Sequence, residues 1–201
     1  MRPTISHYYR SAIESAKKEV ESTPDDRVLG MDGEEWVEYL TQKHGMFEIS
    51  LDDSRPEEMS EVDREYRLRG HDFLTDRPPG TLVRETMVQI ELPVQPSDTL
   101  QVIWQLKLSP NTFSLSHGYP PFDYDHERGL FTDVVQPQPA AVKRGFDEIR
   151  KTVRAYNESI TSENQGFRPR ITQLVTTKLD RVREKHKSLD GLAAEVGIPL
   201  K

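Results

Sequence analysis

The sequence contains no cysteine, and it has little apolar or aromatic material. The absence of cysteine excludes disulfide bonds, thiolate catalysis and the zinc sites that need cysteine ligands. Only 34% of the 201 residues are hydrophobic and 8% are aromatic, whereas 30% are charged. The mean hydropathy is -0.72. These values indicate a modest core, which suits helices with one apolar stripe better than a sheet buried on both faces.

Long hydrophobic runs are also lacking. In residues 1–20, Arg10, Glu14, Lys17 and Lys18 interrupt the apolar stretches, unlike the core of a secretory signal peptide. No segment approaches the roughly 20 apolar residues of a membrane span. Because the chain has no cysteine, it forms no disulfide bond that would need an oxidising compartment. The composition therefore predicts a cytoplasmic protein in a reducing compartment, with no membrane partner. The length suits one ordinary domain or two small ones.

Charge is unevenly distributed along the chain, whose formal net charge is -7. Residues 1–136 hold 26 Asp and Glu against 14 Lys and Arg, whereas residues 137–201 hold 8 against 13. This split favours attraction within one chain, between two copies, or between the basic part and an acidic partner. A solvated helix face rich in Lys and Arg explains the same pattern.

Hydrophobic periodicity predicts two helices near the start of the chain. A stripe from Ile5 to Val20 indicates a helix over about residues 6–21. A second helix begins near Asp32, which precedes Glu35 by three residues as in a capping pair, and Gly45 ends it.

A β section is predicted to follow these helices. Alternation over residues 47–51 indicates a short strand, and charged residues 52–80 are interpreted as a connector with a helical turn around residues 57–66. Residues 95–99 have the length of a hairpin turn. The further predicted strands of this small, mainly antiparallel sheet cover residues 82–94, 100–108, 113–115 and 130–135.

Residues 137–201 carry the most regular pattern in the chain. Apolar residues recur every three or four positions from Val142 to Ile160 and again from Ile171 to Leu189. Residues 164–168 are interpreted as a turn, with Pro169 in the first turn of the next helix. Two antiparallel helices are therefore predicted. The candidates for their interaction seam are Phe146, Ile149, Val153, Leu179, Val182 and Leu189.

The predicted fold is α+β, with a small, mainly antiparallel sheet, N-terminal helices and a C-terminal antiparallel two-helix hairpin. We divide the chain into an acidic helical region with one short strand at residues 1–78, a β section at residues 79–136 and a basic hairpin at residues 137–201. The last two parts are expected to form one compact unit.

No motif for catalysis or cofactor binding is present. The chain lacks a serine nucleophile elbow, a phosphate-binding loop and a dinucleotide fingerprint, so neither an enzyme nor a cofactor is expected. Imidazoles and carboxylates gather at His117, Asp123, Asp125 and His126, and such groups bind divalent metals. Their spacing matches no metal motif, and Pro120-Pro121 favours an ordered turn between strands instead.

Arg181 and His186 resemble the Arg-x4–6-His signature of HEPN ribonucleases. The resemblance implies RNA cleavage by this pair in an all-helical fold. Two features depart from that family: Val182 replaces the polar residue it favours, and a substantial β section is present. Because His186 falls on the apolar stripe, a histidine in the helix seam is the favoured alternative.

A module that binds nucleic acid is a further alternative, because a basic helical hairpin can follow phosphates. Glu148, Glu158, Asp180 and Glu184 interleave with the basic side chains, and no aromatic ladder accompanies them. A solvated face is therefore favoured. The basic residues concerned are Lys143, Arg144, Arg150, Lys151, Arg154, Arg168, Arg170, Lys178, Arg181, Arg183, Lys185 and Lys187.

The order of these parts resembles an accessory segment that precedes TIR or Mrr-like nuclease effector domains in bacterial antiphage-defence proteins. The similar residues are the strand Val88–Pro93, the segment Phe113–Leu115, Asn157 and the ending Ala194–Leu200. In that family an effector domain follows the Gly-Ile-Pro-Leu ending. The resemblance therefore implies either a piece of a longer protein or an effector on a separate chain.

These observations predict a non-catalytic sensor, regulator or assembly subunit of a bacterial multi-protein system, acting in antiphage defence through protein–protein contacts. The expected partner is an effector protein or another copy of the chain, bound through the apolar stripe. Charged faces would set the specificity of that contact.

Overall fold

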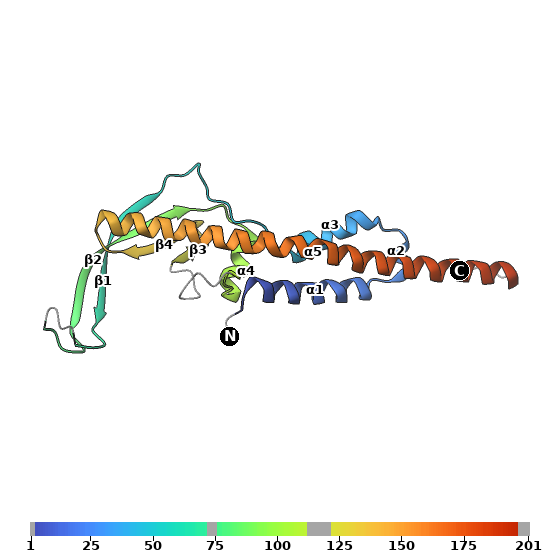
Figure 1. The fold of residues 1–201 in the computed structure, drawn as a ribbon, viewed down its shortest axis with the longest axis horizontal. Coiled ribbons are helices and arrows are strands. Elements are labelled where there is room, and N and C mark those ends of the chain that lie inside the picture. The colour runs from blue at the N-terminus through green and yellow to red at the C-terminus, as the bar shows by residue number, and fades with distance from the viewer. Residues whose placement is uncertain (1–2, 72–75, 112–121, 197–201) are drawn as a thin grey trace. The chain divides into compact units, whose positions relative to one another are not determined.

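The computed structural model describes residues 3–71, 76–111 and 122–196, and its fold is α+β as predicted (Figure 1). The chain forms two compact units, one of residues 1–48 and 158–201 and the other of residues 49–157. The first is helical and the second contains the sheet. Because helix α5, Pro139–Val196, contributes to both, the units are not consecutive segments of the chain.

Three helices precede α5 in the helical unit: α1 Ile5–Ser22, α2 Asp25–Leu29 and α3 Gly33–His44. Helix α1 buries the predicted stripe, including Tyr9 and Val20. The Asp32 carboxylate accepts hydrogen bonds from the backbone N–H groups of Glu34 and Glu35 at 2.8 and 2.9 Å, which satisfies two free donors at the start of α3. Both predicted helices are confirmed, and α2 is an additional short one.

The second unit contains a four-stranded antiparallel sheet in the order β1-β2-β4-β3. Strands β2, Leu82–Pro93, and β4, Leu130–Val135, agree with the sequence prediction. Strand β3, Asp123–Asp125, was not predicted, and the segment 113–115 lies outside the described residues. Gly145 of α5 approaches the sheet so closely that a Cβ there would lie 2.6 Å from Cδ1 of Ile90.

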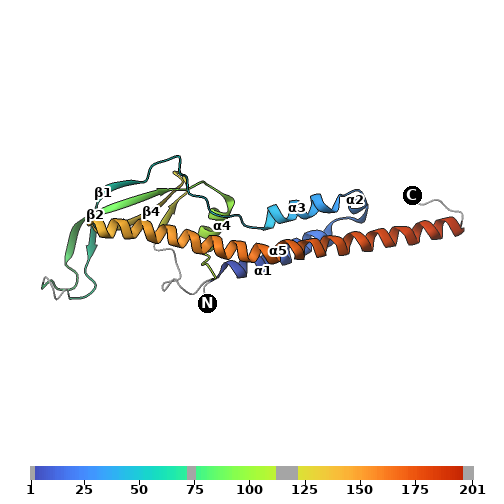
Figure 2. The ribbon, with the colours of Figure 1, turned by 45° about the horizontal axis from the view of Figure 1, so that its top comes forward.

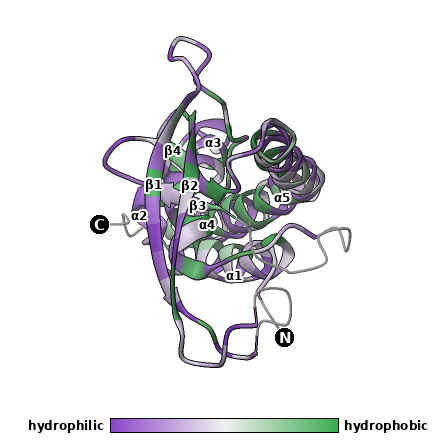
Figure 3. Ribbon diagram, turned by 90° about the vertical axis from the view of Figure 1, so that its left-hand side faces the viewer, coloured by the Kyte–Doolittle hydropathy of each residue, from purple (hydrophilic) through white to green (hydrophobic). Residues whose placement is uncertain are grey.

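Strand β1, Glu58–Arg67, corrects the prediction of a connector with a helical turn. All ten of its residues pair with β2, and residues Leu82–Met87 of β2 pair with β1 alone. The two strands thus continue beyond the pairing with β4 as a two-stranded arm (Figure 2). Because β1 is exposed and mostly hydrophilic (Figure 3), its sequence shows no buried face.

Residues 100–108, predicted as a strand, belong mainly to helix α4, Asp98–Leu106. The Ser97 hydroxyl accepts a hydrogen bond from the backbone N–H of Leu100 at 3.3 Å and caps this helix. Leu100 and Ile103 are buried three positions apart. The segment has apolar residues at both helical and strand spacing, so its alternation alone gave the wrong element.

Residues 47–51 do not form the predicted strand, and only Leu51 makes an isolated bridge, with Val94. The N–H of Ile49 donates to Oδ1 of Asn157 at 2.7 Å, and Nδ2 of Asn157 donates to the carbonyl of Ile49 at 2.9 Å. A side chain of α5 therefore satisfies the backbone groups that a neighbouring strand would have bound. Ile49 is buried, whereas Phe47 is 56% exposed.

The predicted two-helix hairpin is wrong, because α5 is one continuous helix through Gly166 and Pro169 (Figure 1). Ile160, Phe167 and Ile171 are all buried. The step from Ile160 to Ile171 is eleven residues, or about three helical turns, so the apolar face keeps its phase through the predicted turn. Pro169 lies on the exposed side, where its missing N–H costs one hydrogen bond without disturbing the core.

Replacing Pro169 with Ala tests the continuous helix. A proline inside a helix costs about 3 kcal/mol, so Pro169→Ala should raise the free energy of unfolding by about 2–3 kcal/mol. Urea unfolding followed by circular dichroism measures this, with exposed Arg170→Ala as the control. An unchanged or lower stability would instead fit a second helix that begins at Pro169.

Replacing Asn157 with Ala tests its support of residue 49. Two part-buried backbone groups would lose their partners, so the free energy of unfolding should fall by about 2 kcal/mol or more. The neighbouring exposed residue provides the control, Glu158→Ala, which should change the same urea transition by less than about 0.5 kcal/mol. Equal effects of the two variants would contradict this role.

Candidate interaction site

An apolar depression with a volume of about 600 Å³ lies in the sheet unit. Residues of β1, β2 and the first turns of α5 form it, and we call it the apolar groove. Met59 of β1 is 68% exposed and contributes one wall. The groove is lined by Glu57, Met59, Val88, Pro137, Gln138, Pro139, Val142, Lys143, Phe146, Asp147 and Arg150.

Charged side chains at the rim of the apolar groove are mostly bound to each other. Arg150 forms an ion pair with Glu57 and a second, at 3.7 Å, with Asp147. Its guanidinium also lies 5.7 Å from the ring centre of Phe146. In the described part of the chain Lys143 has no ion pair. The rim is therefore close to neutral, and the apolar walls dominate the groove.

A second apolar surface lies near the end of α5. Leu189, Leu192 and Val196 are 41%, 58% and 60% exposed. Their spacing of three and four residues continues the helical stripe beyond Val182, which is buried. We call these three residues the exposed stripe. A helix face that continues its apolar pattern without internal packing is typical of a protein-binding surface.

The six predicted seam residues do not meet across a hairpin, because all lie on one helix. Ile149 and Val153 are buried in the sheet unit, and Leu179 and Val182 are buried in the helical unit. Phe146 lines the apolar groove, and Leu189 belongs to the exposed stripe.

Sequence reasoning missed the other members of the two surfaces. Leu192 and Val196 extend the stripe by the same three- and four-residue steps and were available to the periodicity argument. Met59 and Val88 belong to strands whose pairing places them at the groove, and no local pattern showed this.

Several basic side chains of α5 are already bound to acidic groups in the helical unit. Lys178 is buried, and its Nζ lies 3.0 Å from Oδ1 of Asp25, while Nζ of Lys185 lies 2.8 Å from Oδ2. Hydrogen bonds from Lys185 and Lys178 lower the pKa of Asp25 to about 2. Arg168 binds Glu38 at 2.7 Å. Fewer cations of α5 therefore face solvent unpaired than the sequence indicates, which weakens the nucleic-acid alternative.

Arg181 and His186, the pair with the ribonuclease resemblance, are both exposed on α5. Nδ1 of His186 lies 2.8 Å from Oδ2 of Asp190, one turn further along. The side chain of His186 is 49% exposed, so the predicted seam position is wrong. The residue falls just past the last buried position, Val182, and so the stripe does not pack there.

The candidate metal cluster is only partly described, since His117 lies outside the described residues. Oδ1 of Asp125 accepts hydrogen bonds from the backbone N–H groups of Glu127 and Arg128 and so stabilises a turn. The ring of His126 packs against Tyr124, with centres 4.5 Å apart. In residues 3–71, 76–111 and 122–196, no group of three metal-binding side chains occurs.

The chain matches no protein-family model, and neither the curated proteins nor the solved structures contain a match to it. Among the described helices, none combines the length and apolar character needed to cross a membrane.

The Asp25 contacts predict a pH dependence of stability. Its pKa in the folded chain, about 2, lies below the ordinary value of 3.8, so the bound carboxylate stabilises the fold above about pH 4. That contribution should be lost as the pH falls through 2. In an NMR titration, Lys185→Ala should raise the pKa of Asp25, whereas exposed Lys187→Ala should not. Equal values in all three proteins would contradict the contact.

Proposed function

We propose that this chain is a non-catalytic regulatory or assembly subunit that acts through protein–protein contacts in a cytoplasmic bacterial antiphage-defence system. The observation that carries the contact mechanism is the exposed stripe of α5. The resemblance to segments that accompany effector domains supports the link with defence. The apolar groove supplies a concave surface of the kind that receives an amphipathic helix.

We assign another copy of the chain as the partner of the exposed stripe. Around and before the stripe, exposed Arg183 and Lys187 alternate with exposed Glu184, Asp190 and Glu195, so this part of the helix is close to neutral. The rim of the apolar groove is close to neutral as well. Burial of apolar side chains, rather than charge, therefore favours the binding of the stripe of one copy in the groove of the next.

Size also favours this contact. The groove, with a volume of about 600 Å³, is an open depression with room for several apolar side chains. The three side chains of the stripe span two helical turns and offer a compact apolar ridge of matching scale. Binding would cover Met59, Leu192 and Val196, which are the most exposed apolar side chains of the two surfaces.

A contact between two different surfaces is heterologous, so it can join more than two copies. It also allows a complementation test, because each copy contributes one surface to each contact. A copy with a defective groove retains its stripe, and a copy with a defective stripe retains its groove. These two defective copies should bind each other in a 1:1 complex.

The variants Met59→Glu and Leu192→Glu test this proposal. Light scattering after size exclusion should show association of the wild type at tens of micromolar and monomers of each variant, since both substitutions place a charge in an apolar contact. Mixing the two variants should yield a dimer. Leu106→Glu, at a 52% exposed position outside both surfaces, should associate like the wild type.

Three outcomes would overturn the assembly. The wild type could stay monomeric, the single variants could associate normally, or the mixture could remain monomeric. A wild type that stays monomeric but binds an effector chain through Leu192 would replace the second copy with an effector as the partner.

A further inference from the structure

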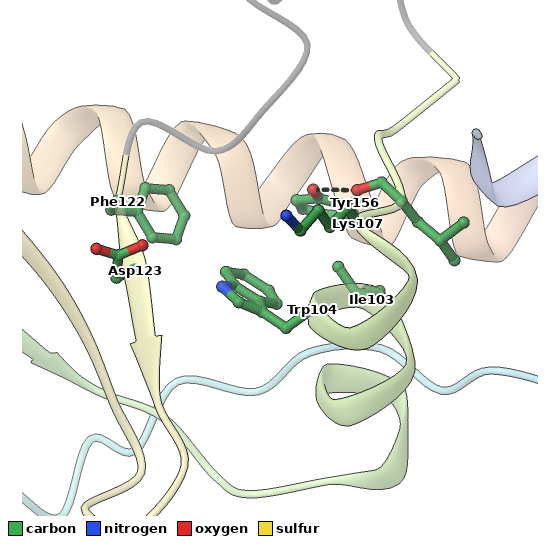
Figure 4. Close-up of a pocket in the computed structure, with 7 residues that line it drawn as sticks. Ile103, Trp104, Lys107, Phe122, Asp123 and Tyr156 are labelled. Carbon is green, nitrogen blue, oxygen red and sulfur yellow. Dashed lines mark hydrogen bonds between the residues drawn. The ribbon is translucent and has the colours of Figure 1, made fainter. Parts of the chain in front are cut away.

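A smaller pocket of about 210 Å³ lies in the sheet unit, between α4, β3 and α5 (Figure 4). The side chains of Trp104, Phe122 and Tyr156 form its aromatic walls, with Ile103 and Leu108 beside them. We call it the aromatic pocket. Its volume exceeds that of the roughly 150 Å³ engineered cavity that binds benzene, so one ring or branched alkyl group with a few polar atoms would fit.

The walls of the aromatic pocket are held by the core behind them. The ring of Trp104 stacks on Phe131 with centres 5.3 Å apart, and it lies 5.4 Å from Tyr124. The Tyr156 hydroxyl donates a hydrogen bond to the carbonyl of Leu108 at 2.9 Å. This bond engages the hydroxyl hydrogen, so Tyr156 contributes its apolar ring to the pocket.

Two opposite charges face this apolar space. The ammonium group of Lys107 lies on the α4 side and the Asp123 carboxylate on the β3 side of the pocket, and both residues are exposed at its mouth (Figure 4). Within the described chain, neither group has an ion pair. Two separated and unneutralised charges of opposite sign beside one apolar pocket are complementary to a molecule that carries both charges.

The backbone of Lys107 adds an independent argument. Lys107 ends α4 in the left-handed conformation, with φ 50° and ψ 44°, and the N–H of Leu108 bonds to the carbonyl of Ile103 at 3.0 Å. Glycine is the usual residue at this position because a side chain is strained there. Glycine would relieve this strain, so the Lys107 side chain must contribute something in return, either to the helix C-terminus, where a cation is favourable, or to a ligand in the pocket.

We propose that the aromatic pocket binds a small zwitterion with an apolar body, of the type of a free α-amino acid with a branched or aromatic side chain. Lys107 holds the carboxylate, and Asp123 holds the ammonium group, which also lies near the face of Trp104. The apolar body packs on Trp104 and Phe122. This site is independent of the proposed assembly, since its lining excludes the residues of the apolar groove and the exposed stripe.

The experiment uses the full chain with L-leucine, L-methionine and L-phenylalanine as probes. Because Trp36 is the second tryptophan, a Trp36→Phe spectrum assigns the Trp104 indole N–H signal in NMR. At least one amino acid should shift that signal in a saturable manner. For L-leucine, 4-methylpentanoate lacks the ammonium group and 3-methylbutylamine lacks the carboxylate, and each should bind at least about tenfold more weakly.

Lys107→Gly separates binding from folding. This variant relieves the left-handed strain, so its melting temperature should rise while amino-acid binding falls at least about tenfold. Asp123→Asn should weaken binding similarly, and exposed Lys151→Gln should leave it unchanged. Wild-type affinity in Lys107→Gly, equal binding of 4-methylpentanoate, or no shift with any of the three amino acids at millimolar concentration would overturn the proposal.

Discussion

The apolar face of α5 from Ile149 to Val182 supplies core side chains to both compact units, and the other elements of each unit pack around its own part of that face. Gly145 allows the sheet to approach the helix, since a side chain there would meet Ile90. Gly33 plays a comparable part in the helical unit, where a Cβ at this residue would lie 3.0 Å from Cδ1 of Leu179. Only 34% of the residues are hydrophobic, and one helix supplies apolar side chains to the cores of both units.

Two asparagines on this helix bind backbone groups of irregular residues, one asparagine within each unit. Asn157 binds both backbone groups of Ile49 in the sheet unit. One heptad later, Nδ2 of Asn164 donates to the carbonyl of Met46 at 3.0 Å in the helical unit. Amide side chains carry both a donor and an acceptor, so they can replace the hydrogen bonds of a missing strand. The segment therefore has buried positions at Met46 and Ile49 without regular secondary structure.

The sequence predicted the helices and strands whose signals are local. It did not predict the structure of segments that depend on contacts with residues far away in the chain. Helices α1 and α3 follow from an apolar stripe and the Asp32 cap, and strands β2 and β4 follow from their alternation. Strand β1 has no buried face to reveal it, and the segment at Ile49 depends on Asn157, more than a hundred residues away. The hairpin was predicted for another reason. Gly166 and Pro169 are residues typical of a turn, although the apolar periodicity continues unbroken past both residues. For the candidate sites, periodicity placed Leu189 on the apolar stripe but assigned it to a hairpin seam, whereas the groove and the aromatic pocket required the pairing of strands that sequence cannot supply.

The exposed apolar residues fall into two kinds, and only one kind requires explanation. Single exposed apolar side chains such as Leu106 are normal on protein surfaces. Leu189, Leu192 and Val196 differ because they repeat at helical spacing on a face that is buried up to Val182. Apolar residues exposed by chance would not continue the helical spacing of the buried ones. The same reasoning applies to Lys107, where a charged side chain occupies a backbone conformation that favours glycine. In both places the chain departs from what its own folding requires, and functional sites are expected where such departures occur.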